Sequence, residues 1–214
     1  MLPPLITLEE HFFSPECLST FQVKYSEQLK YLPGLADKLR DLGELRLQDM
    51  NAGRISIQVI SHGPGTLSTS QCLAANDQLA TAVAKNTARF AGFAVLPMIE
   101  PDAAAKELVR CVREFGFVGA LIDNHVSGKY CDGPEYYPVF QAAQELDVPI
   151  YLHPSKYPLH RAACGLGLTL RYLAWPSEDM APRYSGNFSN GAEASLGASG
   201  FGWNSETVSP ILIE

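Results

Sequence analysis

Short strand-like segments alternate with helical patterns over the first 160 residues of this 214-residue chain, and no other feature restricts the possible fold as much. Five segments have the length and apolar pattern of strands, namely residues 5–11, 55–61, 90–96, 117–122 and 148–153. Helical spacing occurs at residues 76–90, 101–115 and 138–146. Strands that alternate with helices are typical of a parallel sheet with crossover helices, so we predict an α/β fold with about five βα units.

The composition argues against several kinds of partner. The 16 basic and 23 acidic residues give a net charge of −7 and form no basic cluster for nucleic acid or anionic membranes. No apolar run approaches the roughly 20 residues that cross a bilayer, and the N-terminus lacks the basic region of a secretory signal. The odd number and wide spacing of the cysteines indicate reduced thiols (Cys17, Cys72, Cys111, Cys131 and Cys164). We therefore expect a cytoplasmic protein that binds neither nucleic acid nor membranes.

The end of the first predicted strand carries the first candidate site. A side-chain period of two places Glu9 and His11 on one face of the strand and Ile6 on the other. Both polar residues lie at the carboxyl end, where barrels of βα units carry their active residues. A carboxylate beside an imidazole supplies half of a divalent metal site, although a plain polar pair at a strand end has the same spacing.

The end of the fifth predicted strand carries a second imidazole. His153 is followed by Pro154, which ends the strand and leaves the histidine at the carboxyl edge. A single histidine at a strand end is compatible with a structural role. Two strand ends that supply Glu9, His11 and His153 to the same edge favour a metal site over that alternative.

Two further strand ends supply candidate substrate contacts. His62 opens a His-Gly-Pro-Gly turn after the second strand, whose glycines allow close approach of a ligand to the backbone. Asn124 lies in an Asp-Asn-His run after the fourth strand. We predict that both residues contact the substrate, while an ordinary βα loop explains each of them equally well.

Five segments in this order resemble the amidohydrolase-related decarboxylases, which include the resorcylate, dihydroxybenzoate and aminocarboxymuconate-semialdehyde decarboxylases. They are LEEHF at residues 8–12, RLQDM at 46–50, RFAGFAVLP at 89–97, GFVGALI at 116–122 and DVPIYLHP at 147–154. The resemblance extends from residue 5 to about residue 160. Five motifs in one order are far more specific than a single short pattern.

The resemblance implies a (β/α)₈ barrel of the TIM type with a divalent metal, zinc or manganese, at its mouth. It also implies that Glu9, His11 and His153 are the metal ligands from the first and fifth strands. In such a site the metal binds the carboxylate and ortho-hydroxyl of an aromatic acid, a general acid protonates the ring carbon, and carbon dioxide leaves. No organic cofactor is implied.

The last quarter of the chain departs from the family pattern. The family completes its site with a histidine on the next strand and a late aspartate, and the chain has no histidine after His160. Three missing βα units would need about 100 further residues. We therefore expect the N-terminal part of a barrel over residues 1–160 and an irregular, Gly/Ser-rich tail over 161–214, as in a C-terminally truncated barrel.

Three functions remain open on the sequence alone. The first is a lyase that decarboxylates a small hydroxylated aromatic acid, and the second is a metal-dependent hydrolase on the same scaffold. The third is an inactive fragment that acts only by associating with a full-length relative, since five βα units leave two open strand edges and an uncovered interior, which favour association or aggregation, and a homo-oligomer is the other form of association.

Overall fold

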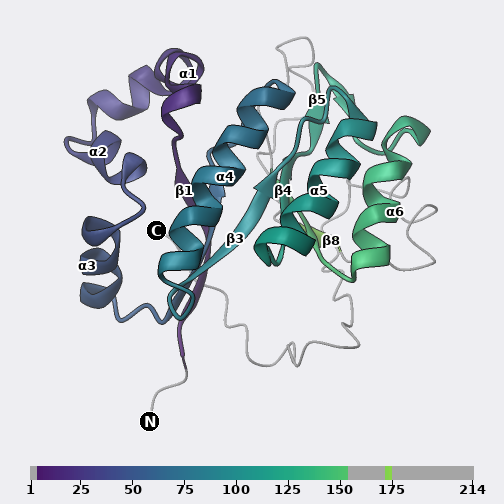
Figure 1. Ribbon diagram of the computed structural model, residues 1–214. Coiled ribbons are helices and arrows are strands. Elements are labelled where there is room, and N and C mark those ends of the chain that lie inside the picture. The colour runs from purple at the N-terminus through teal and green to yellow at the C-terminus, as the bar shows by residue number, and fades with distance from the viewer. Residues whose placement is uncertain (1–3, 154–171, 175–214) are drawn as a thin grey trace. The chain divides into compact units, whose positions relative to one another are not determined.

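Six strands of the computed structural model form one curved sheet (Figure 1). The structure describes residues 4–153 and 172–174. The sheet has the order β1 (Ile6–Phe12), β2 (Ile57–His62), β3 (Phe90–Val95), β4 (Gly119–Asp123), β7 (Ile150–His153) and β8 (Tyr172–Ala174). The first five strands are parallel, and β8 pairs antiparallel with β7. All five predicted strands are confirmed, each to within two residues, and they form half of a parallel barrel.

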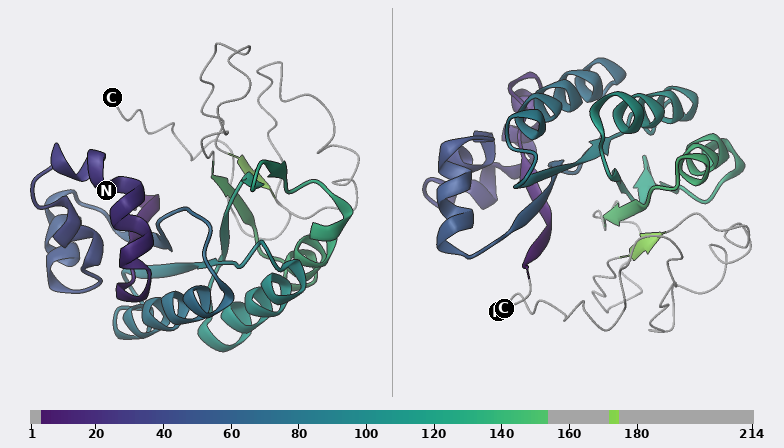
Figure 2. Two further views of the ribbon diagram at one scale, coloured as in Figure 1. Left: turned by 90° about the horizontal axis from the view of Figure 1, so that it is seen from above. Right: turned by 60° about the horizontal axis from the view of Figure 1, so that its bottom comes forward.

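Helices follow the strands as βα units require. The helices are α1 (Leu18–Lys30), α2 (Leu35–Arg40), α3 (Glu44–Ala52), α4 (Thr69–Lys85), α5 (Pro101–Phe115) and α6 (Tyr137–Leu146). A short hairpin joins β5 (His125–Val126) to β6 (Lys129–Tyr130), and single 3₁₀ turns lie at η1 (Pro15–Cys17) and η2 (Pro134–Tyr136). Figure 2 shows α4, α5 and α6 side by side along the outer face of the sheet.

The three helix predictions were right in type, and those for α4 and α6 differed from the structure in their bounds. The bounds of α5 are as predicted, because Pro101 stands in its first turn and Gly116 ends it in a left-handed conformation. Helix α4 begins seven residues earlier than predicted, since Ser68 and Gln71 form a reciprocal capping box. It ends at Lys85, ahead of β3. The helices α1 to α3 between β1 and β2 were not predicted.

The inner face of the sheet is apolar in its middle. One buried side chain from each of four strands meets there, namely Val59, Phe93, Leu121 and Tyr151. Each of these residues is at most 6% exposed. Side chains from these four neighbouring strands thus fill the interior of the half-barrel.

A bulge in β1 changes which residues face this interior. Thr7 pairs with Gln58 and Glu10 pairs with Ile60, so two residues of β1 stand opposite one residue of β2. The strict alternation predicted for this strand is therefore wrong for Ile6, which packs against the inner cluster. Beyond the bulge, Glu9 and His11 also face the interior, as their contacts described below show.

A buried polar network joins α4 and α5 to the end of β3. The Asn76 side chain donates to the Val95 carbonyl at 2.9 Å and accepts from the Val95 N–H at 3.0 Å. It also donates to Glu107 at 2.7 Å, and Glu107 accepts two hydrogen bonds from Arg110. Cys111 donates to the same carboxylate at 3.3 Å. The network fixes the carboxyl end of β3 against two helices.

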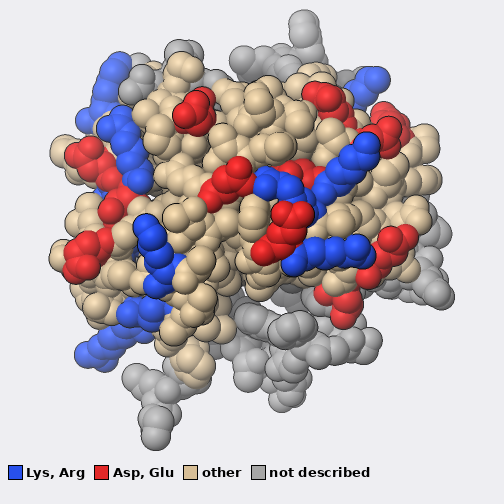
Figure 3. Space-filling model, viewed as in Figure 1, with Lys and Arg blue, Asp and Glu red and all other residues tan. Residues whose placement is uncertain are grey.

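The outer surface carries both signs of charge. Figure 3 shows basic and acidic side chains interspersed over the helical face. Ion pairs such as Lys38 with Asp49 at 2.8 Å contribute to this mixture. No helix in the described part of the chain is long and apolar enough to cross a membrane. Cys17, Cys72, Cys111 and Cys131 are buried free thiols, while Cys164 lies outside the described residues.

Candidate active site

The carboxyl ends of β1 and β7 bring three of the predicted site residues to one end of the barrel interior. The imidazoles of His11 and His153 meet edge to face, with ring centroids 5.8 Å apart. The Tyr151 hydroxyl donates to Glu9 Oε1 at 2.7 Å and so places the carboxylate on the same side. Residues 142 positions apart in the chain thus meet because the sheet curves.

His11 has the protonation state that a metal ligand needs. Its Nδ1 is hydrogen-bonded to Ser61 Oγ at 3.0 Å, which orients the ring from the neighbouring strand. Burial first, and then the charge of His153, lower the pKa of His11 to about 4, against the opposing effect of Glu9. The ring is therefore neutral near pH 7, and only a neutral imidazole offers a lone pair to a cation.

His153 lies beside a carboxylate that the sequence analysis did not select. Asp123 pairs with His153 in the register of β4 and β7, and its Oδ1 lies 3.6 Å from His153 Nδ1. Both atoms are buried, and neither has a hydrogen-bond partner among the described residues. Because nearly all buried polar atoms are paired, two such atoms side by side indicate a place for a further atom. Asp123 ends the strand that neighbours the strand of His153, and this position at the carboxyl edge was the signal that could have identified it.

His62 occupies a different environment from the one predicted. Its Nε2 accepts from the Ser14 N–H at 3.0 Å, and its Nδ1 lies 3.0 Å from the Gly63 carbonyl. The ring packs edge-on against Phe12 and Phe21 and is 1% exposed. Burial lowers the pKa of His62 to about 4. Both ring nitrogens thus contact backbone groups in this structure, and contact of His62 with a substrate stays a prediction.

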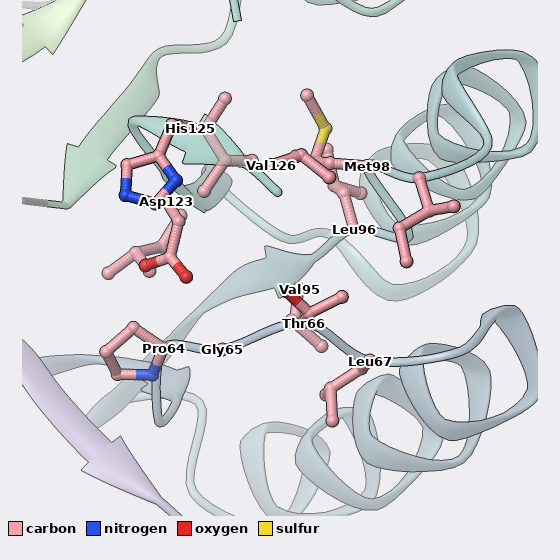
Figure 4. A pocket seen from close by; sticks show the side chains of 13 residues that line it. Pro64, Gly65, Thr66, Leu67, Val95, Leu96, Met98, Asp123, His125 and Val126 are labelled. Carbon is pink, nitrogen blue, oxygen red and sulfur yellow. The ribbon is translucent and has the colours of Figure 1, made fainter. Parts of the chain in front are cut away.

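Asn124, which follows β4 and was predicted to contact the substrate, makes two backbone hydrogen bonds. Asn124 donates its backbone N–H to the His153 carbonyl at 3.0 Å and accepts from the Cys131 N–H at 3.3 Å. Its neighbours Asp123 and His125 line a small pocket at the mouth, and Figure 4 shows the Asp123 carboxylate between His125 and Pro64. Asn124 is absent from that lining. The backbone of Asn124 therefore connects the ends of β4 and β7.

A larger cavity opens beside the two imidazoles. It has a volume of about 280 Å³, close to the lower end of the range of about 300–1,000 Å³ for small-molecule sites. His11 and His153 form its polar part, and its other lining residues are Phe13, Tyr25, Leu29, Leu35, Leu39, Gly63 and Pro64. An apolar wall with a few polar groups at one end suits a small planar molecule that carries a polar substituent.

The donor types at this end fit a divalent cation. One carboxylate and two imidazoles are ligands shared by zinc and manganese sites. As the side chains stand, no three histidine, cysteine or acidic residues within 4–153 and 172–174 are grouped closely enough to hold an ion. The residues therefore fit a metal in kind, while the late histidine and aspartate motifs expected from the family do not occur in the sequence.

Two curated relatives align with most of the length of this chain. Decarboxylase orsB of Emericella nidulans is 45% identical over 216 residues, which cover 99% of this chain and 60% of that protein. Gamma-resorcylate decarboxylase of Rhodococcus jostii is 37% identical over 180 residues, which cover 74% of this chain and 52% of that protein. This chain thus spans about half to 60% of the length of the relatives it matches.

A solved structure shares the fold. The dihydroxybenzoic acid decarboxylase of Polaromonas sp. JS666, with bound manganese and the inhibitor 2-nitroresorcinol, has a TM-score of 0.66 and 36% identity. The match covers 74% of this chain and 51% of that chain. The amidohydrolase family model matches residues 10–213, which includes the segment from residue 161 that the sequence analysis set apart as a tail. With the half-barrel and its strand-end residues, this match shows that the chain belongs to the amidohydrolase family.

Proposed function

We propose that this chain provides the metal-binding half of a decarboxylase that removes carbon dioxide from a hydroxylated aromatic carboxylic acid without oxidation. The observation that carries the proposal is the convergence of Glu9, His11 and His153 beside a cavity of about 280 Å³. The decarboxylase names of the relatives, and the manganese and nitroresorcinol in the Polaromonas structure, support it.

Different groups of described residues would bind the metal ion and the substrate ring. Glu9, His11 and His153 would hold a zinc or manganese ion, which when bound supplies Lewis-acid polarisation of the substrate carboxylate and hydroxyl. His11 is neutral because its pKa is about 4, so it binds a cation without first losing a proton. Phe13 and Tyr25 line the cavity with aromatic rings that would pack against the substrate ring and exclude water.

The reaction needs one proton transfer. The bond between the ring carbon and the carboxylate breaks, its electron pair stays on the ring carbon, and a general acid protonates that carbon as carbon dioxide leaves. The catalytic acid is not assigned to a described residue. The family resemblance implies a late histidine and aspartate for this step, and this sequence has neither motif.

The full chain tests this proposal in two measurements. Metal analysis of the purified protein is expected to find zinc or manganese, with loss in Glu9→Ala and His153→Ala but retention in Glu114→Ala, an exposed acidic residue of α5. Carbon dioxide release from 2,6- and 2,4-dihydroxybenzoate is expected from the metal-loaded protein. Absence of metal from the wild type would overturn the site, and hydrolysis of an aromatic lactone without carbon dioxide release would overturn the reaction.

A further inference from the structure

Tyr151 is rigidly placed in the barrel interior by its neighbours. It pairs with Leu121 in the register of β4 and β7, and both residues belong to the inner cluster. Its side chain is 4% exposed, and its ring lies 6.3 Å from that of Phe93. A ring held this way by a packed layer gives its hydroxyl a fixed position.

The hydroxyl reaches a strand that is not adjacent in the sheet. Tyr151 OH donates to Glu9 Oε1 at 2.7 Å, although β2, β3 and β4 separate β7 from β1 in the sheet order. The hydrogen bond therefore crosses the concave side of the curved sheet. It is short, as expected for a hydroxyl that donates to a charged carboxylate.

The backbone at Glu9 is shaped to meet this hydroxyl. Glu9 has a φ of 59°, in the left-handed region that non-glycine residues rarely adopt. The residue lies in the β1 bulge between Thr7 and Glu10. Bulges next to active sites redirect side chains, and strained residues gather where the surrounding structure requires them. The strain and the hydrogen bond together give the carboxylate one orientation.

We propose that Tyr151 is a positioning residue, whose hydroxyl holds the Glu9 carboxylate in place for a divalent metal ion. This inference rests on the metal site of the proposed function. The hydroxyl donates to Oε1 and restricts rotation of the carboxylate, so that Glu9 presents its carboxylate to the ion in one orientation. Groups that orient metal ligands in this way typically contribute 10- to 100-fold to metal affinity.

Manganese binding to the full chain tests the inference, with free Mn²⁺ followed by electron paramagnetic resonance. Tyr151→Phe removes only the hydroxyl and is expected to weaken Mn²⁺ binding by about 10- to 100-fold. Tyr137→Phe, at an exposed tyrosine of α6, is expected to bind as the wild type does. Glu9→Gln is expected to lose binding, and adding Tyr151→Phe to Glu9→Gln should change nothing further, because Tyr151 acts through Glu9.

A packing control separates the hydroxyl from the ring. Phe93→Leu perturbs the same inner cluster without touching the hydroxyl and should bind Mn²⁺ nearly as well as the wild type. Equal losses in Phe93→Leu and Tyr151→Phe would overturn the positioning role. Wild-type binding by Tyr151→Phe, with binding lost in Glu9→Gln, would overturn it while the metal site stands. A wild type that binds no Mn²⁺ would overturn the metal site and this inference together.

Discussion

Asp123 and His153 end two neighbouring parallel strands with their side chains together, Oδ1 of the one lying 3.6 Å from Nδ1 of the other. The distance is too long for a hydrogen bond, and neither atom has another partner within residues 4–153 and 172–174. A carboxylate beside the non-ligating nitrogen of a metal-bound histidine commonly orients the ring. Substitution of Asp123 therefore tests whether its carboxylate orients the His153 ring.

Removal of the Asp123 carboxylate is expected to weaken metal retention through His153. Asp123→Ala should lower metal affinity by about tenfold, whereas Asp123→Asn, which keeps an acceptor oxygen, should have a smaller effect. Titration with Mn²⁺ or Zn²⁺ measures both. Equal affinities of Asp123→Ala and the wild type would show that the carboxylate does not orient the ring.

Acid is expected to destabilise the fold through His62. The pKa of His62 is lowered from 6.5 to about 4 by burial, so between these values the unfolded chain binds a proton that the folded chain does not. Stability contributed by neutral His62 is complete above about pH 6.5 and falls as pH decreases toward 4, by about 2 kcal/mol between pH 7 and pH 5. Urea unfolding at the two pH values measures this loss.

The variant His62→Gln tests whether His62 causes the loss of stability at low pH. His62→Gln should show a smaller drop in unfolding free energy between pH 7 and pH 5 than the wild type does. His11, whose pKa is also lowered to about 4, accounts for a remaining drop in the same range. An unchanged pH dependence in His62→Gln would contradict the assignment.

The Glu107 network is expected to contribute substantially to stability. Glu107→Ala leaves Asn76 and the partly buried Arg110 without their shared acceptor, so the unfolding free energy should fall by about 3 kcal/mol. Glu107→Gln keeps an acceptor and should cost less. Glu114→Ala, on an exposed position of the same helix, should stay within about 0.5 kcal/mol of the wild type. Equal unfolding free energies for Glu107→Ala and Glu114→Ala would rule out a stabilising network.

Gly119 is expected to tolerate no side chain at the start of β4. A Cβ there would lie 2.4 Å from the Pro149 carbonyl oxygen, and its φ is 153°. Gly119→Ala should therefore lower the unfolding free energy by about 3 kcal/mol, because backbone atoms cannot move aside as a side chain can. Gly53→Ala, where a Cβ meets atoms at 3.4 Å, is the matched control and should be nearly neutral. Thermal unfolding compares the two, and similar melting temperatures would contradict the clash.

Much of the sheet could be predicted because the signals are local. The five parallel strands are separated by turns and helices whose patterns can be recognised within one segment, such as Pro101 and Gly116 at the ends of α5. The convergence of Glu9, His11 and His153 followed from a general rule, since parallel strands bring their carboxyl ends to one edge. Helices α1 to α3, which lie between β1 and β2, were not predicted.

The roles of individual side chains were harder to predict. His62 and Asn124 lie at strand ends like the proposed ligands, and only the structure shows His62 bonded to Ser14 and Gly63. Asp123 gains its significance from its place beside His153 across the sheet. A strand-end position therefore identifies the edge where a site forms, while the partners of each side chain determine what it does there.

The sequence by itself determined the βα order, the parallel sheet and the residue types at its carboxyl edge, because these depend on local pattern and on the period of strands. Only the tertiary structure decided that Ile6 faces the interior with His11, since a bulge shifts the alternation. It alone also decided that Tyr151 holds Glu9 across the barrel. The curvature of the sheet creates that contact, and curvature arises from the twist and packing of all strands together.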